Sequence, residues 1–303
     1  MAQGMSSQVR IFRVDAFTAV ACTGNPACVV LDAGALEEHT LQSLTRELGG
    51  VDVAFVLPPD AADHDLRLRF FTPRTETGLV GHATLAAHAV LDALGYRPAR
   101  RQKQRGGVID IEQFAGAHGT LYAFSQPLPA LHGPLPSDRL TPILSALGVA
   151  PAELDPDCPP VVAGAGGNRA LIALRSGATL AHLRPDLFRL AQLSATGSPA
   201  GFFVYSLAPA IPDCDTEARM FCPALGIAED PVSGNAHALL AARLCAVGRM
   251  PERSGTREFI ARQGHHMGRP GTLWVRVSAD SGGGERVRVA GRARIVFEAT
   301  LNA

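Results

Sequence analysis

The chain carries no excess of charge and no long apolar segment. Among its 303 residues, Lys plus Arg number 28 and Asp plus Glu number 28, so no global positive field attracts nucleic acid or an anionic membrane. Glycine, proline or charge interrupts every apolar run well before the roughly 18 residues of a membrane-spanning helix. The first ten residues also lack the apolar core of a signal peptide. We therefore expect a cytoplasmic globular protein that binds neither nucleic acid nor a membrane.

The cysteines and histidines show no metal-binding pattern. The six cysteines form no CxxC pair and mostly lie among apolar residues, which favours structural thiols over redox or metal roles. His82 and His88 are six positions apart on a predicted helix and point to different sides of it. His265-His266 has no carboxylate or cysteine at ligand spacing. We expect no bound metal, and we expect His88 and His237 to be packing residues.

Two similar apolar helices are predicted at residues 81–95 and 234–248, the second beginning 153 residues after the first. Each opens with glycine and a polar residue, continues through Ala and Leu, which favour helix, and closes on a glycine suited to a left-handed cap. Both are almost wholly apolar, which is typical of a helix buried on all sides. Each is expected to be the axis of a domain.

The repeat extends beyond these helices. Arg69-Phe70-Phe71-Thr72-Pro73 matches Arg219-Met220-Phe221-Cys222-Pro223, and each block reaches its helix through Glu76 or Glu229. Two further pairs of matching blocks precede them: Gly24-Asn25-Pro26-Ala27 with Gly167-Asn168-Arg169-Ala170, and Ala54-Phe55-Val56 with Phe202-Phe203-Val204. This order predicts a duplication of about half the chain, too long a period for a solenoid. We expect two similar domains that face each other.

The domains are predicted at residues 1–127 and 128–303, with 127–136, which holds four prolines, as the linker. Whether the last strand belongs to the second domain or returns to the first is left open. Amphipathic or short helices are expected at 36–48, 140–147 and 185–193. Strands are expected at 9–17, 27–31, 51–57, 65–71, 107–114, 118–126, 171–174, 201–207, 217–222, 257–262, 271–278 and 287–297. Many strands against one buried helix per half predict an α+β fold.

Both buried helices offer an anion-binding N-terminus, at Gly81 and at Gly234. Two such ends at an interdomain cleft would hold a small anion such as a carboxylate. Titratable residues lie nearby in the sequence: His82 at the first helix start, Asp230 before the second, and Asp52 at the start of an apolar strand. From the residues alone, Asp52 is either a solvated edge residue or a carboxyl group aimed into a pocket. Asp15, Asn25 and Glu76 are expected to fix turns and strand ends.

Four blocks carry a resemblance to a known family. They are Val14-Asp15-Ala16-Phe17 with Gly24-Asn25-Pro26, Phe71-Thr72-Pro73 before Gly81-His82-Ala83-Thr84, Glu229-Asp230-Pro231-Val232-Ser233-Gly234-Asn235-Ala236, and Gln263-Gly264-His265-His266-Met267-Gly268-Arg269-Pro270. From about residue 10 to the C-terminus the chain resembles the PhzF family of phenazine-biosynthesis isomerases. The resemblance implies a diaminopimelate-epimerase-like fold, in which two pseudo-symmetric β-barrels each surround one helix and the active site lies between them.

The resemblance also implies roles for residues. Asp52 takes the position of the family's catalytic glutamate, and His82 and Asp230 match its supporting His and Asp. Our own hypothesis is that the helix N-termini at Gly81 and Gly234 bind the substrate carboxylate, with Ser233 and Asn235 as further binding residues. Asn235 stands where the phenazine enzyme has serine. The resemblance further implies a homodimer and general acid/base catalysis without cofactor or metal. Because Asp is one methylene shorter than Glu, the sequence leaves the substrate open.

Three functions compete at this point. The expected one is an isomerase that moves a proton within a small unsaturated carboxylic or amino acid. A binding protein that kept the fold and lost the chemistry is the alternative outside catalysis. An epimerase or racemase of this fold would need a cysteine before each buried helix, where this chain has Val80 and Ser233, so that activity is disfavoured.

Overall fold

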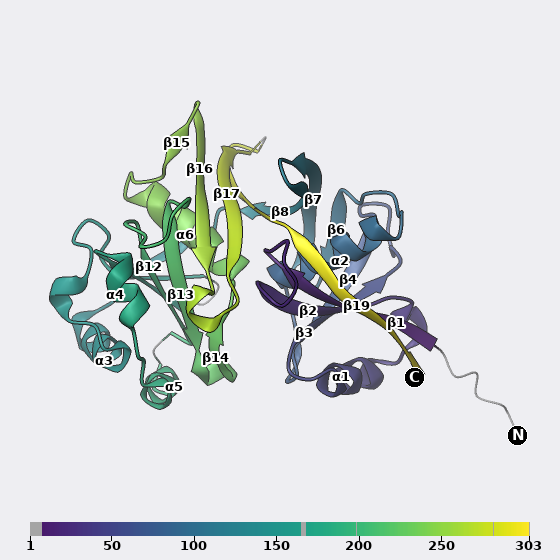
Figure 1. Ribbon diagram of the computed structural model, residues 1–303, viewed down its shortest axis with the longest axis horizontal. Helices are drawn as coiled ribbons and strands as arrows, with labels where there is room; N and C mark the ends of the chain where they lie inside the picture. Colours follow the sequence, from purple (N-terminus) through teal and green to yellow (C-terminus); the bar gives the residue numbers. More distant parts are fainter. Residues whose placement is uncertain (1–7, 165–167, 198, 281, 303) are drawn as a thin grey trace, which may run out of the picture. The chain divides into compact units, whose positions relative to one another are not determined.

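The computed structural model describes residues 8–164, 168–197, 199–280 and 282–302. Gly167, the first residue of one repeat block, lies outside them. The chain forms two compact units. Unit 1 comprises Met1–Gln126 and Ala290–Ala303, and unit 2 comprises Pro127–Val289. The last strand therefore returns to unit 1, where β19 (Ala293–Asn302) pairs antiparallel with β1 (Gln8–Ala16) (Figure 1).

Unit 1 is a strongly curved set of strands around the helix α2 (Gly81–Ala93). Strand β1 pairs antiparallel with β2 (Asn25–Val30), β2 pairs parallel with β3 (Asp52–Leu57), and β3 pairs antiparallel with β4 (Leu66–Phe71). The short β5 (Glu76–Thr77) pairs with β4 and leads into α2. Parallel to β4 runs β6 (Arg101–Gln104), followed by β7 (Gly107–Gly116) and β8 (Gly119–Pro127).

Nine of the thirteen residues of α2 are buried, so this helix is the core of unit 1 and not a surface helix. Side chains alternate along the strands, and they separate into two apolar clusters. One cluster packs on α2 and includes Ala54, with Val56 against it. The other includes Val53, Phe55 and Leu57 and packs on the amphipathic helix α1 (Glu38–Glu47). The sheet is thus covered by a buried helix on one face and a surface helix on the other.

Unit 2 repeats this order of strands. Strand β10 (Val161–Ala163) pairs with β11 (Arg169–Leu174), β11 pairs parallel with β12 (Gly201–Ser206), and β12 pairs antiparallel with β13 (Thr216–Cys222). The short β14 (Ile227–Asp230) leads into α6 (Gly234–Ala246), which also has nine buried residues. Strand β16 (Thr256–Gln263) runs parallel to β13 and is followed by β17 (Gly271–Ala279) and β18 (Glu285–Gly291).

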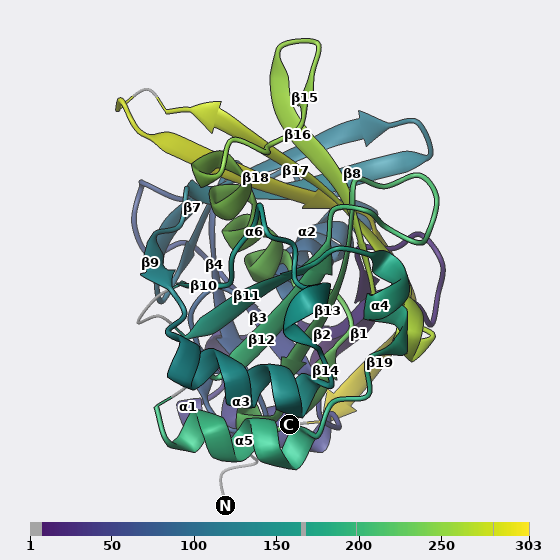
Figure 2. The same cartoon turned by 90° about the vertical axis from the view of Figure 1, so that its left-hand side faces the viewer.

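Three helices cover the other face of β11 and β12: α3 (Ser137–Leu147), α4 (Gly177–His182) and α5 (Leu187–Ala195). Figure 2 shows α3 and α5 close together near the end of the unit. The remaining elements are short: the 3-10 turns η1 (Ala33–Ala35), η2 (Pro151–Glu153), η4 (Pro223–Leu225) and η5 (His265–Met267), and the strands β9 (Leu131–Pro134) and β15 (Glu252–Arg253). No helix among the described ranges has the length and apolar character needed to cross a membrane.

A repeated ion pair confirms the duplication. Arg69 of β4 forms a bidentate pair with Glu76, with both N···O distances at 2.8 Å. Arg219 of β13 forms the same pair with Glu229, at 2.9 and 2.8 Å. Each guanidinium also lies over the ring two residues further on, Phe71 or Phe221. The pair ties β5 or β14, the segment that leads into the central helix, to its neighbouring strand.

The register corrects one repeat block. Arg69 lies opposite Phe55, and Arg219 lies opposite Val204. Phe55 is therefore equivalent to Val204, and the sequence match of Phe55-Val56 with Phe203-Val204 was wrong by one residue. The similarity of the residues favoured the wrong alignment of the two repeats, whereas the hydrogen-bonded strand register gives the right one. With the corrected register, Gly201 is the equivalent of Asp52, and unit 2 has no carboxyl group there.

The proline-rich segment 127–136 is not a free linker, contrary to the expectation from its composition. Its middle forms β9, which pairs with β10, and Leu135 donates its backbone N–H to the carbonyl of Pro160. Proline is compatible with such a short strand when its missing N–H is not needed for pairing. The segment is part of the sheet of unit 2.

Candidate active site

The Asp52 side chain faces the central helix of unit 1. Asp52 is the first residue of β3 and alternates with Ala54 and Val56, which pack on α2. His82 is the second residue of α2. The Oδ2 atom of Asp52 lies 3.5 Å from Nε2 of His82, and the two side chains are 22% and 13% exposed. The structure thus brings together two of the predicted catalytic residues, at a distance slightly longer than a direct hydrogen bond.

Asn25 completes this group from the other side of the imidazole. It is the first residue of β2 and has the same orientation as Ala27 and Val29, toward α2. Its Nδ2 lies 3.4 Å from Nδ1 of His82. With the amide N–H donating to Nδ1, the imidazole proton of neutral His82 lies on Nε2, on the side of Asp52. Sequence reasoning assigned Asn25 only to a turn, because its approach to His82 depends on strand pairing.

The turn before Asn25 requires glycine. Gly24 has φ of +61°, and a Cβ at this position would lie 2.2 Å from the carbonyl oxygen of Ala16. Asp15 closes the same turn, since its Oδ2 accepts the backbone N–H of Cys22 at 2.7 Å. The expectation that Asp15 fixes a turn is confirmed, and the turn sets the start of β2 and hence the position of Asn25.

Burial raises the pKa of Asp52 from 3.8 to about 6. The cause is desolvation, which penalises the carboxylate more than the neutral acid. A carboxyl group that titrates near pH 6 has substantial populations of both forms close to neutral pH. It can therefore accept a proton in one step and return it in another, which an ordinary surface aspartate does poorly.

In unit 2, the predicted residues gather at the start of α6. Ser233 is the N-cap residue, and its Oγ accepts the backbone N–H of Ala236 at 3.3 Å. Asp230 ends β14, and Gly234 and Asn235 are the first two residues of the helix. The four predicted residues therefore belong to one turn, as the sequence block suggested.

Gln263 holds this turn in place. Its side chain is fully buried, its Nε2 donates to the carbonyl of Asp230 at 2.6 Å, and its Oε1 accepts the N–H of Ser233 at 3.1 Å. The adjacent Gly264 has φ of +87°, and a Cβ there would lie 2.8 Å from the carbonyl oxygen of Pro231. Sequence reasoning quoted both residues in a family block without a role. Their function as a clamp follows only from the parallel pairing of β16 with β13.

His88 and His237 are confirmed as packing residues. Nε2 of His88 lies 2.8 Å from Oε1 of Gln102, and Nδ1 of His237 lies 2.8 Å from the carbonyl oxygen of Ser233. Burial lowers the pKa of each imidazole to about 4, so both are neutral at physiological pH. Thr84, the residue equivalent to His237, donates its hydroxyl to the carbonyl of Val80. In both helices, the backbone carbonyl of the N-cap residue thus accepts a hydrogen bond from the side chain four residues later.

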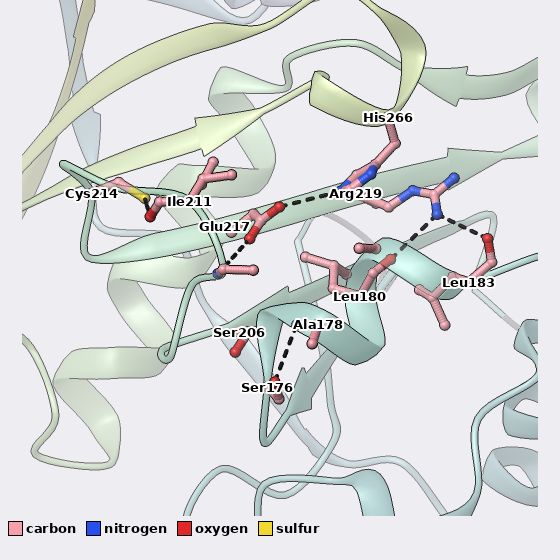
Figure 3. A network of polar contacts seen from close by, with 12 residues as sticks. Ser176, Ala178, Leu180, Leu183, Ser206, Ile211, Cys214, Glu217, Arg219 and His266 are labelled. Carbon is pink, nitrogen blue, oxygen red and sulfur yellow. Dashed lines mark hydrogen bonds and ion pairs between the residues drawn. The ribbon is translucent and has the colours of Figure 1, made fainter.

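A second acid–base contact lies in unit 2 (Figure 3). The carboxylate of Glu217 is buried, and its oxygens contact Nε2 of His266 at 3.2 Å and the backbone N–H of Ala210 at 3.0 Å. Although burial acts to raise the pKa of Glu217, the bonds from His266 and Ala210 outweigh it and lower this pKa. The carboxylate therefore stays ionised and anchors the 265–267 turn.

Across the described ranges, no three His, Cys, Asp or Glu side chains are arranged to hold a metal.

A family model for phenazine biosynthesis-like proteins, PhzC-PhzF, matches residues 14–299. The chain belongs to the PhzC-PhzF family. Among curated members, it is 34% identical to the uncharacterized isomerase YddE of Escherichia coli K12, over 96% of this chain and 97% of the relative. It is 33% identical to an uncharacterized isomerase of Deinococcus radiodurans, over 95% and 93% of the two chains.

Solved structures give the PhzC-PhzF chain a diaminopimelate-epimerase-like α+β fold. A Bacillus anthracis protein of the PhzF family superposes with a TM-score of 0.85 at 24% identity and covers 97% of this chain and 99% of its own. A hydroxyproline epimerase from Agrobacterium vitis, solved with bound trans-4-hydroxy-L-proline, has a TM-score of 0.62 at 10% identity and coverages of 98% and 93%. These likenesses confirm the predicted fold class.

Proposed function

We propose that this protein is an isomerase that moves a proton between two carbons of a small unsaturated carboxylic or amino acid, with Asp52 as the proton carrier. The observation that supports this most is the group formed by Asp52, His82 and Asn25 in unit 1. A desolvated carboxyl group with a pKa raised to about 6 lies 3.5 Å from an imidazole whose other nitrogen is 3.4 Å from the amide of Asn25. Membership of a family whose curated relatives are named isomerases agrees with this reaction class.

The reaction needs one carboxyl group in two protonation states. The Asp52 carboxylate removes a proton from an allylic carbon, and the electron pair left behind is delocalised through the double bond into an extended anion. The neutral Asp52 then returns the proton to the other end of that system, which shifts the double bond and restores the carboxylate. Nε2–H of His82 stabilises the ionised Asp52 or donates to a developing substrate oxyanion.

Substrate binding is assigned to the starts of the central helices. The first N–H groups of α2 at Gly81 and of α6 at Gly234 have no partner within their helices, and the helix dipoles favour an anion there. Glycine at these two positions lets a carboxylate approach the backbone closely. Asp230 and Asn235 would contribute polar contacts, while Ser233 keeps its hydroxyl on the helix cap.

A one-base reaction fits these residues better than epimerisation by two bases. Val80, the N-cap of α2, cannot accept a proton, and Ser233 is the N-cap of α6. The equivalent of Asp52 in unit 2 is Gly201, so these two equivalent positions supply one carboxyl group and not a pair. A cytoplasmic location and the absence of a metal stay predictions from the sequence, and the homodimer, the independence of a cofactor and any link to phenazine biosynthesis stay predictions of the resemblance.

The test is double-bond migration or deuterium incorporation in deuterated water, followed by proton NMR. The panel contains dihydro-hydroxyanthranilate and unsaturated amino and carboxylic acids. We expect one class to react with the wild type, Asp52→Asn to lower its rate by at least about a hundredfold, and Asp110→Asn, an exposed aspartate on β7, to leave the rate unchanged. Full activity of folded Asp52→Asn would refute the assignment.

Two other outcomes separate the alternatives. A compound that binds but neither exchanges nor isomerises would favour the binding protein. Inversion at a saturated carbon would favour an epimerase, and Val80 and Ser233 would then have to be reconsidered. Asp52→Glu restores the side-chain length that the resemblance leads us to expect of the phenazine enzyme. A gain of activity on dihydro-hydroxyanthranilate in this variant would show that the shorter side chain selects another substrate.

A further inference from the structure

Unit 1 contains a cavity of about 570 Å³ at the end of the sheet away from Asp52. Its walls come from the ends of β2 and β3, the start of β4, the last turns of α2 and the loop between α2 and β6. The volume is within the range of about 300–1,000 Å³ that is usual for small-molecule sites. The cavity therefore has room for a ligand of one or two rings.

This cavity is separate from the proposed active site. Asp52 begins β3 and Leu57, a lining residue, ends it, so about 16 Å of extended chain lies between them. Along α2, His82 and the lining residue Leu91 are nine positions apart, or about 13 Å. The two sites lie at opposite ends of the same strand and the same helix.

The interior of the cavity is apolar. Leu31, Leu57, Leu66 and Leu91 contribute aliphatic walls, so an apolar ligand body would be removed from water on several sides. Tyr96 lines the cavity and is 56% exposed, which is high for so large a ring. An exposed aromatic ring beside an apolar cavity is suited to stack on a planar ligand.

Two guanidinium groups supply hydrogen-bond donors to the lining of the cavity. Arg97 and Arg100 line the cavity, and within the described part of the chain neither guanidinium has a hydrogen-bond acceptor. The carboxylate of Asp65 interacts electrostatically with both guanidinium groups, but its hydrogen bonds go to the backbone, because its Oδ2 accepts the N–H groups of Arg100 and Arg101 at 2.7 and 2.9 Å. Asp32 also lines the cavity, so the four formal charges cancel. Selectivity would thus come from the unused guanidinium donors and not from net charge.

We propose that this cavity is a second binding site, for a small organic anion with an apolar, ring-containing body. The body would occupy the aliphatic pocket beside Tyr96, and a carboxylate or sulfonate would accept hydrogen bonds from Arg97 and Arg100. The proposal does not depend on the reaction assigned to Asp52. Its ligand would stabilise unit 1 by mass action.

The probe is 1-anilinonaphthalene-8-sulfonate, compared with the uncharged N-phenyl-1-naphthylamine, both followed by their fluorescence with the full chain. Gly34→Phe fills the cavity without backbone strain, since Gly34 lines it and a Cβ there meets only Pro58 Cδ at 3.9 Å. The double variant Arg97→Ala with Arg100→Ala removes the donors. Arg189→Ala, an exposed arginine on α5 of unit 2, is the matched control.

We expect Gly34→Phe to weaken the binding of both probes at least about tenfold. The double arginine variant should weaken only the binding of the sulfonate, by a similar factor. Arg189→Ala should bind like the wild type. Hydrogen exchange with the sulfonate bound should slow at residues 96–101. Equal binding by all variants, absence of sulfonate binding by the folded wild type, or protection centred on residues 81–84 would each overturn the proposal.

Discussion

Replacing Glu229 by Gln removes the charge from an ion pair that anchors the approach to α6. The side chains of Arg219 and Glu229 are only 7% and 14% exposed, so the guanidinium loses its counter-ion in a poorly solvated place. The new amide would also direct an NH2 group at the guanidinium. Two carbonyl acceptors remain, Leu183 at 3.0 Å and Leu180 at 3.4 Å, and they moderate the loss (Figure 3). We expect unit 2 to lose about 3 kcal/mol, near the lower end of values for broken buried pairs.

The duplicated fold supplies the control. In unit 1, Arg69 and Glu76 form the same bidentate pair but are 27% and 19% exposed, and Glu38 lies 3.5 Å from Arg69 as a second anion. Water and Glu38 compensate part of the charge of the Arg69 guanidinium, so Glu76→Gln should lower the free energy of unfolding of unit 1 by only about 1 kcal/mol.

Trp274, the only tryptophan, lies on β17 in unit 2 and reports that unit by its fluorescence during urea unfolding. Glu229→Gln should move the tryptophan transition to lower urea with an unchanged slope, and Glu76→Gln should move it little. An equal or larger effect of Glu76→Gln on this transition would refute the reasoning from burial. So would an unchanged transition in Glu229→Gln.

Three further predictions concern the sites themselves. Folding raises the pKa of Asp52 from 3.8 to about 6, so the neutral acid stabilises the folded state. This stabilisation is present in full below pH 3.8, and about 3 kcal/mol of the free energy of unfolding is lost as the pH rises through 6. In urea unfolding followed by circular dichroism, Asp52→Asn should make the free energy of unfolding less dependent on pH over this range. Gln263→Ala removes the acceptor of the Ser233 N–H, so hydrogen exchange at that amide should quicken about tenfold or more. Gly24→Ala should lower stability by several kcal/mol, whereas Gly49→Ala, also at positive φ but with no atom near its Cβ, should cost only about 1 kcal/mol.

The sequence predicted the helical axes of the fold well, because composition alone identifies a helix buried on all sides. The expected helices at 81–95 and 234–248 correspond to α2 and α6, and both begin at the predicted glycine. The strands expected at 107–114 and 118–126 correspond to β7 and β8, which pair antiparallel. These features depend on local pattern, which a single sequence displays directly.

Features that depend on pairing between distant strands were missed. The slip of one residue between the repeats and the strand β9 inside the proline-rich segment both needed a register that no local pattern supplies. The same holds for the site. Asp52, His82 and Asp230 could be named from the sequence, but the contact of Asn25 with His82 and the clamp formed by Gln263 could not.

The ionisation of Asp52 decides whether this residue can carry a proton, and it can be measured before any substrate is known. The carboxyl carbon of Asp52 would be followed by carbon-13 NMR from pH 3 to pH 8 in the full chain and assigned by its absence in Asp52→Asn. We expect a midpoint near pH 6, because burial of this carboxyl group raises its pKa. A midpoint at or below the ordinary value of 3.8 would show a solvated aspartate, and the proposed proton carrier would be contradicted.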